Sequence, residues 1–115
     1  MKILVFGEII WDLYPDKKCI GGAPFNFAAY TAGAGVETHL LSAVGQDPLG
    51  DRALEYVREY GVRTDLILRS SRPTGSCQVT LNESGVPTYT LVENTAYDAI
   101  LVGPGATETD FDLLY

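Results

Sequence analysis

The sequence predicts an α/β fold in which a parallel sheet is covered by helices and a small antiparallel sheet stands beside it. Over residues 1–61, short apolar runs alternate with segments of helical periodicity, which is the pattern of a parallel layer. Over residues 65–98, strand-like segments follow one another without a helix between them, which is typical of antiparallel pairing. With 115 residues, of which 46% are hydrophobic, the chain is long enough to bury a core.

The first half contains two predicted strands and two predicted helices. Residues 3–10 are nearly all apolar, and a run this short is typical of a strand buried on both faces. The spacing of Ala, Phe and Tyr predicts a helix over residues 25–34, and residues 36–44 then form a second core strand. Residues 49–60 predict an amphipathic helix because their apolar side chains fall on one stripe, and Gly61 ends it.

The second half contains three short predicted strands, at residues 65–69, 75–82 and 87–93. The last two alternate polar and apolar residues and are joined by residues 82–86, which include a glycine suited to a hairpin turn. An antiparallel flap of this kind beside an α/β layer is suited to act as a lid over a ligand site. The apolar end at residues 111–115 predicts the start of another buried strand, so we expect the chain to be cut off inside a larger domain.

Composition argues against several classes of partner and site. The chain carries 8 Lys and Arg against 15 Asp and Glu, a net charge of −7, which disfavours binding to nucleic acid. No apolar run approaches the roughly 20 residues of a membrane span, and no signal-peptide cleavage site follows the first strand, so we expect a cytoplasmic protein without membrane contact. Cys19, Cys77 and His39 lack the number and spacing of a structural zinc site, so we expect no metal, two buried reduced thiols and a strand histidine.

Common nucleotide-binding motifs are missing from the sequence. There is no Gly-x-x-x-x-Gly-Lys-Ser/Thr phosphate loop. Residues 103–108 begin like a dinucleotide fingerprint, but Glu108 stands where a glycine is needed, and its charge opposes a pyrophosphate. Residues 33–35 are rich in glycine, and a loop that ends a helix is their simplest interpretation. We therefore expect no cofactor-binding residue in this chain.

One group of residues near the N-terminus is suited to bind a hydroxyl-rich molecule. Asp12 follows the first predicted strand, and ligands of open parallel sheets bind beyond the carboxyl ends of strands. Gly21 and Gly22 allow a ligand to approach the backbone closely, and Asn26 brings an amide that both donates and accepts hydrogen bonds. The alternative is structural: Asp12 can cap a turn and Asn26 can cap the helix, and local chemistry does not decide between the two.

Several motifs in order along the chain resemble the first signature region of the ribokinase-like (PfkB) carbohydrate kinases. The similarity covers residues 3 to about 100. It consists of GGAPFNFAA at 21–29, Gly35, VGQDPLG at 44–50 and GV at 61–62. Two further motifs are similar to those of bacterial fructokinases, namely FGEIIWD at 6–12 and RPTG at 72–75.

The resemblance implies a three-layer α/β/α ribokinase-like fold with a β lid. It assigns the body to residues 1–11, 21–64 and 99–115, and the lid to residues 12–20 and 65–98. It implies that Asp12, Gly21, Gly22 and Asn26 hold the hydroxyls of a small-molecule sugar. It further implies that Glu93 or Asn94, near the end of the lid hairpin, touches the sugar, and that the lid pairs between subunits in a homodimer.

The chain departs from this family in one important respect. Family members are much longer, and their ATP site and catalytic Asp lie in a later Gly-Ala-Gly-Asp segment, whereas Gly33-Ala34-Gly35 here is followed by Val36. We therefore expect the sugar-binding portion of an ATP-dependent fructokinase-like enzyme, with ATP and Mg²⁺ serving the full-length enzyme and no catalytic residue in this chain. We expect the chain alone to be inactive. A nucleoside kinase of the same superfamily and a non-catalytic polyol-binding module are the alternatives.

Overall fold

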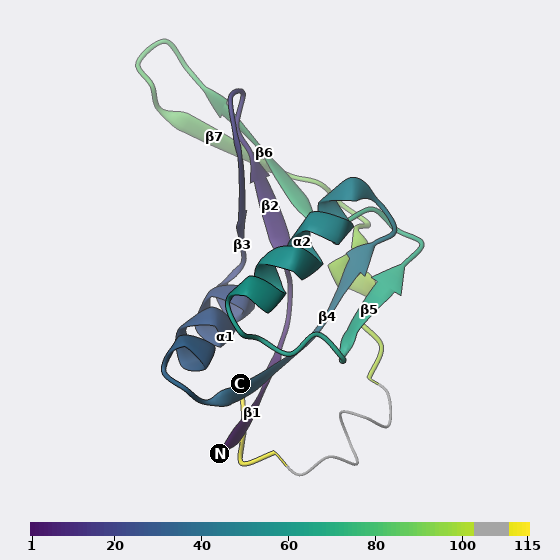
Figure 1. Cartoon of the computed structure of the whole chain (residues 1–115). Coiled ribbons are helices and arrows are strands. Elements are labelled where there is room, and N and C mark those ends of the chain that lie inside the picture. Colours follow the sequence, from purple (N-terminus) through teal and green to yellow (C-terminus); the bar gives the residue numbers. More distant parts are fainter. Residues whose placement is uncertain (103–110) are drawn as a thin grey trace.

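The computed structural model describes residues 1–102 and 111–115 and contains two four-stranded sheets, which Figure 1 shows end to end. The strands are β1 (Lys2–Phe6), β2 (Ile10–Leu13), β3 (Lys18–Gly21), β4 (Glu37–Gly45), β5 (Ile67–Ser70), β6 (Ser76–Leu81), β7 (Pro87–Leu91) and β8 (Leu113–Leu114). The helices are α1 (Ala23–Gly33), α2 (Pro48–Glu59) and the 3-10 helix η1 (Ala96–Ala99). One sheet has the order β5-β4-β1-β8 and the other the order β3-β2-β6-β7.

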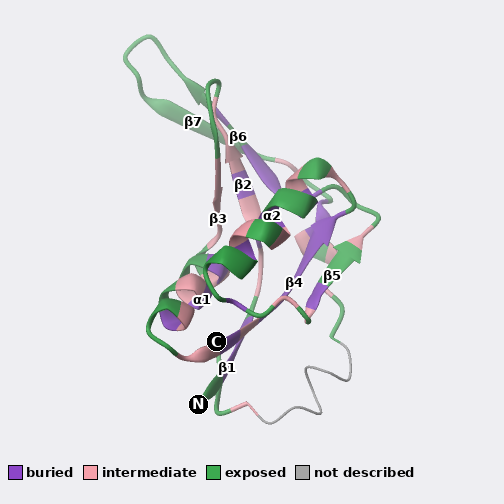
Figure 2. Ribbon diagram, viewed as in Figure 1, coloured by how far each residue is buried: buried purple, intermediate pink, exposed green. Residues whose placement is uncertain are grey.

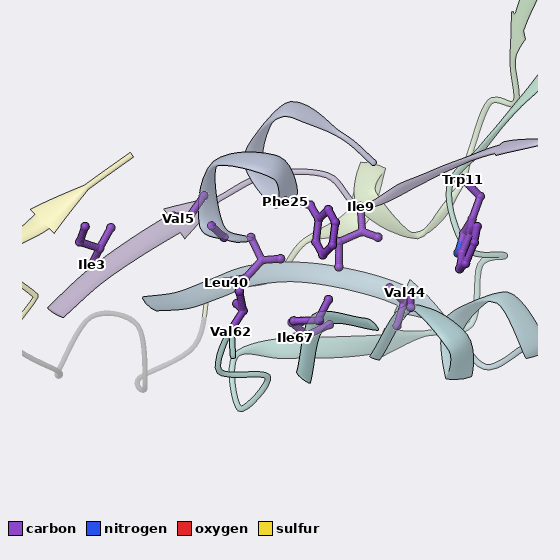
Figure 3. Packing of buried hydrophobic residues seen from close by; sticks show 12 residues of the cluster. Ile3, Val5, Ile9, Trp11, Phe25, Leu40, Val44, Val62 and Ile67 are labelled. Carbon is purple, nitrogen blue, oxygen red and sulfur yellow. The ribbon is translucent and has the colours of Figure 1, made fainter. Parts of the chain in front are cut away.

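The parallel sheet and its helices form the body of the molecule. The connections from β1 to β4 and from β4 to β5 step in the same direction along the sheet. Since such crossovers are right-handed, α1 and α2 lie on the same face of the sheet, as Figure 1 shows. The buried apolar residues of that face include Ile3, Val5, Leu40, Val44, Ala53 and Val57. Figure 3 shows many of these side chains packed along β1 and β4.

The predicted strand over residues 3–10 is wrong, because the chain turns in the middle of this apolar run. Strand β1 ends at Phe6, and β2 starts at Ile10 in the other sheet. Gly7, with φ 145°, makes the turn, and any side chain there would overlap the Pro24 ring. The run stays apolar through the turn because Ile9 is fully buried in the core.

The second sheet is mixed. Strands β2 and β3 pair antiparallel, as do β6 and β7, in agreement with the predicted hairpin. The central pair, β2 and β6, is parallel, although the sequence predicted an antiparallel sheet throughout. The reason is topological: β2 and β6 continue from the carboxyl ends of β1 and β5, which run in the same direction in the body.

Two further segments differ from their predictions. The strand predicted at residues 65–69 is present as β5, but it pairs with β4 in the parallel sheet and not with the lid strands. The predicted strand at the C-terminal end is present as β8, paired with β1, yet Leu113 and Leu114 are exposed and not buried. The sequence resembling a dinucleotide fingerprint, at 103–108, lies outside the described residues.

Burial differs sharply between the two sheets. Figure 2 shows buried residues concentrated in the body, whereas the far end of the β6–β7 hairpin is exposed. Over the described residues, no helix is long and apolar enough to cross a membrane.

Candidate functional site

Asp12 lies in the middle of the second sheet. It is on β2 and is paired in register with Cys19 on β3 and Cys77 on β6. The prediction that Asp12 directly follows the first strand is therefore wrong. Residues directly opposite each other point to the same face, so the Asp12 carboxylate has a thiol on either side. No hydrogen bond joins this carboxylate to another described residue, so Asp12 does not cap a turn in the described part of the chain.

The paired glycines lie beside Asp12. Gly21 is opposite Ile10, and it therefore shares the Asp12 face as a diagonal neighbour, about 7 Å away. A Cβ atom at Gly21 would meet nothing within 4 Å, so the space beside this backbone is open. Gly22 has φ 103°, and a Cβ atom there would lie 2.7 Å from the carbonyl oxygen of Glu8. Only glycine suits that position.

Asn26 follows these glycines in the first turn of α1. Its backbone N–H donates to the Gly22 carbonyl at 2.9 Å, which keeps the two residues one helical turn apart. Gly22 is the N-cap of α1, and no side chain caps this helix, so Asn26 does not act as its cap. The Asn26 side chain is exposed. Asp12 and Gly21 are thus neighbours across the β2–β3 hairpin, and Gly22 and Asn26 follow at the start of α1.

Glu93 is placed differently from these four residues. It lies two residues beyond the end of β7, its side chain is exposed, and the next residue, Asn94, has the left-handed φ of 56°. Among residues 1–102 and 111–115, no hydrogen bond or ion pair links Glu93 to Asp12 or Asn26.

Two residues near the site escaped the sequence reasoning, Glu8 and Tyr97. Glu8 contacts the backbone of Gly22, and Tyr97 on η1 packs against Gly75. Burial raises the pKa of the Tyr97 phenol above its ordinary value of 10.0, and the nearby Asp98 and Glu8 carboxylates act in the same direction. The only sequence signal was indirect: Gly75 ends the Arg-Pro-Thr-Gly motif, but a glycine does not reveal which distant side chain takes the space it leaves.

Asp47 fastens the start of the lid hairpin to the body. Its carboxylate accepts hydrogen bonds from the Gly50 N–H at 2.8 Å, from the Thr74 N–H at 2.9 Å and from the Thr74 hydroxyl at 2.5 Å. The Thr74 hydroxyl oxygen also accepts from the Gly45 N–H at 2.8 Å. Burial acts to raise the pKa of Asp47, but the hydrogen bonds from Thr74 and Gly50 outweigh it, so the net pKa is lowered. The segment entering β6 is therefore held against the N-terminus of α2.

Two features outside this cluster have structural explanations. His39, on β4, contacts the carboxylates of Glu37 at 2.9 Å and Asp65 at 3.2 Å, which confirms it as a strand residue with satisfied nitrogens. Both cysteines are free; Cys77 is buried as predicted, whereas Cys19 is only partly buried.

The two described cavities lie elsewhere. A cavity of about 300 Å³ is lined by Trp11, Lys18, Pro48, Leu49, Arg52 and Tyr56. Trp11 points to the opposite side of β2 from Asp12, because successive strand residues alternate, so this cavity is on the other face of the second sheet. A second cavity, of about 370 Å³, lies beside β5. Neither includes Asp12.

The fold, a parallel sheet joined to a second, mixed sheet, is similar to that of solved sugar kinases. Residues 2–101 match the model of the pfkB family carbohydrate kinases. The chain belongs to this family, and the resemblance read from its motifs is confirmed.

Fructokinases are among the similar proteins. The chain is 30% identical over 107 residues to a fructokinase of Salmonella typhimurium, and the match covers 88% of this chain and 35% of that protein. A crystal structure of fructokinase from Vibrio cholerae O395 in apo form superimposes with a TM-score of 0.80 at 26% identity, covering 87% of this chain and 37% of that one. A fructokinase from Xylella fastidiosa with bound ATP gives a TM-score of 0.75 at 32% identity, covering 84% and 32%. The chain thus spans about a third of the length of these relatives.

Proposed function

We propose that this chain provides the sugar-binding portion of an ATP-dependent, fructokinase-like carbohydrate kinase of the cytoplasm. The observation that carries the proposal is that Asp12 and Gly21 are neighbours across the β2–β3 hairpin with open space beside Gly21, and that the exposed Asn26 follows one helical turn after Gly22. Membership of the pfkB family and the similarity to fructokinases support a sugar as the ligand.

Each group would contribute a different part of sugar recognition. Asp12 would accept hydrogen bonds from sugar hydroxyls, and each such bond to a charged group is worth about 1.5–3 kcal/mol. Asn26 would both donate and accept, which matches a hydroxyl's own capacity. Gly21, with nothing within 4 Å of its absent side chain, would let the sugar approach the backbone.

Phosphoryl transfer needs more than the described residues offer. ATP would supply the phosphoryl group and Mg²⁺ would offset its charge. The glycine-rich residues 33–35 do not fit a phosphate, because they end α1 and do not open a helix whose N–H groups could hold an anion. We therefore assign no transfer step to this chain, and we expect the 115-residue chain by itself to bind sugar without turning over ATP.

Calorimetric titration of the purified chain with fructose, ribose and adenosine tests the proposal. We expect fructose to bind, Asp12→Ala to abolish the binding heat, and the matched variant Asp16→Ala to leave it intact, since Asp16 is exposed in the β2–β3 turn. A response to adenosine instead of fructose would favour a nucleoside kinase. If none of the three compounds binds, the proposal is contradicted. If the chain releases ADP from ATP in a coupled assay, the expected inactivity is contradicted.

We also propose a homodimer formed through the second sheet. The β6–β7 hairpin exposes large apolar side chains, with exposed fractions of 54% for Leu81, 58% for Tyr89 and 55% for Leu91. The strand register places all three on the Asp12 face of the sheet. Sedimentation analysis should show a dimer that Tyr89→Lys converts to a monomer; a wild-type monomer at all concentrations would contradict this proposal.

A further inference from the structure

The side chain of Tyr97 occupies the space that Gly75 leaves empty. A Cβ atom at Gly75 would lie 2.5 Å and 2.6 Å from two carbons of the Tyr97 ring, and 2.9 Å from the Ile9 carbonyl oxygen. Gly75 is buried and directly precedes β6, at the root of the second sheet. The ring therefore lies where the chain passes from the body to the lid, with one side packed on backbone.

Tyr97 is held in place by its neighbours on η1. The Ala96 N–H donates to the Pro73 carbonyl at 2.8 Å, and Ala96 is fully buried. The Thr95 N–H donates to the Asp98 carboxylate at 3.2 Å, which closes the first turn. Because both flanking residues are anchored, the Tyr97 ring has a defined position, while the side chain itself is only partly buried.

The surroundings of Tyr97 connect it to both ends of the candidate site. Its ring abuts Gly75, which also faces the Ile9 carbonyl, next to Glu8 in the sequence, and Gly75 is two residues before Cys77. Glu8 contacts the backbone of Gly22, and Cys77 is the neighbour of Asp12 across the β2–β6 pair. Through Gly75, the Tyr97 ring thus lies at the start of β6, two residues before the strand neighbour of Asp12.

We propose that Tyr97 forms an apolar wall of the sugar site, against which the C–H face of the sugar ring packs. Asp12 and Asn26 supply only polar contacts, whereas a sugar ring presents hydroxyls at its edge and C–H groups on its faces. A rigid aromatic ring complements such a face with little loss of side-chain entropy. The inference rests on the proposed function, because it assigns a role at the same site.

The binding test uses two variants of this residue and one control. Tyr97→Leu should raise the fructose Kd about 3- to 10-fold, whereas Tyr97→Phe, which keeps the ring, should change it less than twofold. Tyr30→Leu is the control, since Tyr30 is 76% exposed on α1. Gly75→Ala should displace the ring and weaken binding similarly, and the double variant Gly75→Ala/Tyr97→Leu should bind no worse than Tyr97→Leu alone.

An NMR measurement on the wild-type chain keeps the inference testable even where a variant fails to fold. The ring signals of Tyr97, assigned by their loss in Tyr97→Phe, should shift on addition of fructose, and those of Tyr30 should not. Fructose binding that depends on Asp12, combined with unshifted Tyr97 signals or an unchanged Kd in a folded Tyr97→Leu, would overturn the role of Tyr97 and leave the proposed function standing. Absence of any fructose binding in the wild type would instead overturn the proposed function.

Discussion

The parallel sheet and the second sheet are stabilised in different ways. In β4, the last six residues are all buried, whereas in β7 all five residues are exposed. The body is therefore held by packed side chains, while the outer hairpin is held mainly by backbone pairing with β6. The difference shows that the stability of the second sheet depends on its attachment to the body. The candidate site lies at the attached end of this sheet and not at the free end, which is the turn of the β6–β7 hairpin.

Two contacts provide that anchorage. On one side of the junction, Asp47 holds Thr74, which is 2% exposed, just before β6. On the other side, the Trp11 indole N–H donates to the Leu49 carbonyl at 3.1 Å, and its ring meets Tyr56 edge-on with centroids 6.0 Å apart. Both contacts reach α2 or the turn before it. Through these two contacts, α2 and the turn before it hold the second sheet in position at the end of the body.

The largest effect is expected from truncating a core side chain of the body. Leu40→Ala removes a side chain with no exposed surface and should lower the free energy of unfolding by about 2–5 kcal/mol. The counterpart in the lid, Val86→Ala at the turn of the β6–β7 hairpin, truncates a residue that is 55% exposed and should cost less than about 1 kcal/mol. Urea unfolding followed by circular dichroism measures both. Equal losses would mean that the two sheets are not stabilised differently.

An intermediate effect is expected at the junction. Asp47→Ala removes the cap of α2 and leaves two N–H groups without their acceptor, so the free energy of unfolding should fall by about 1–3 kcal/mol. Asp51→Ala is the matched control on the same helix; it breaks only an ion pair with Arg69 whose carboxylate side chain is 64% exposed, so it should cost no more than about 1 kcal/mol. Similar losses in the two variants would show that the Asp47 contacts do not anchor the lid.

The same contacts predict a dependence on pH. Because the folded state lowers the pKa of Asp47 below its ordinary value of 3.8, the ionised carboxylate stabilises the fold above that pH. This stabilisation is lost as pH falls through the lower, folded-state pKa. Unfolding measured from neutral pH down to the acid range should therefore show a smaller decline in stability for Asp47→Asn than for the wild type. An identical decline would remove Asp47 from the acid response.

The smallest effect on stability, and a large one on binding, is expected at Gly21. A Cβ atom there meets nothing within 4 Å and the backbone is not left-handed, so Gly21→Ala should change the free energy of unfolding by less than about 1 kcal/mol. If a sugar takes this space, its affinity should fall at least about tenfold. Gly33→Ala is the matched control, because Gly33 is equally open but ends α1. Unchanged fructose affinity in Gly21→Ala would place the sugar elsewhere.

Many elements were predictable because their signals are local. The apolar stripe of α2 and the glycine that follows it are close together in sequence, and the helix predicted at residues 49–60 is found at Pro48–Glu59. The β6–β7 hairpin was likewise predictable from alternation and the turn at residues 82–86. The motif around residues 21–29 indicated the family, which the match over residues 2–101 confirms. The roles of Asp12, Gly21, Gly22, Asn26 and Glu93 in sugar binding stay predictions.

The sequence alone determined α1, α2, most of the strands and the family, because periodicity, helix-ending glycines and turn residues act over a few positions. Only the tertiary structure decided which sheet each strand joins. It split the apolar run of residues 3–10 between two sheets, placed β5 in the body and ran β2 parallel to β6. It also brought Tyr97 against Gly75. These outcomes depend on contacts between residues far apart in the chain, where the same apolar pattern is compatible with several partners.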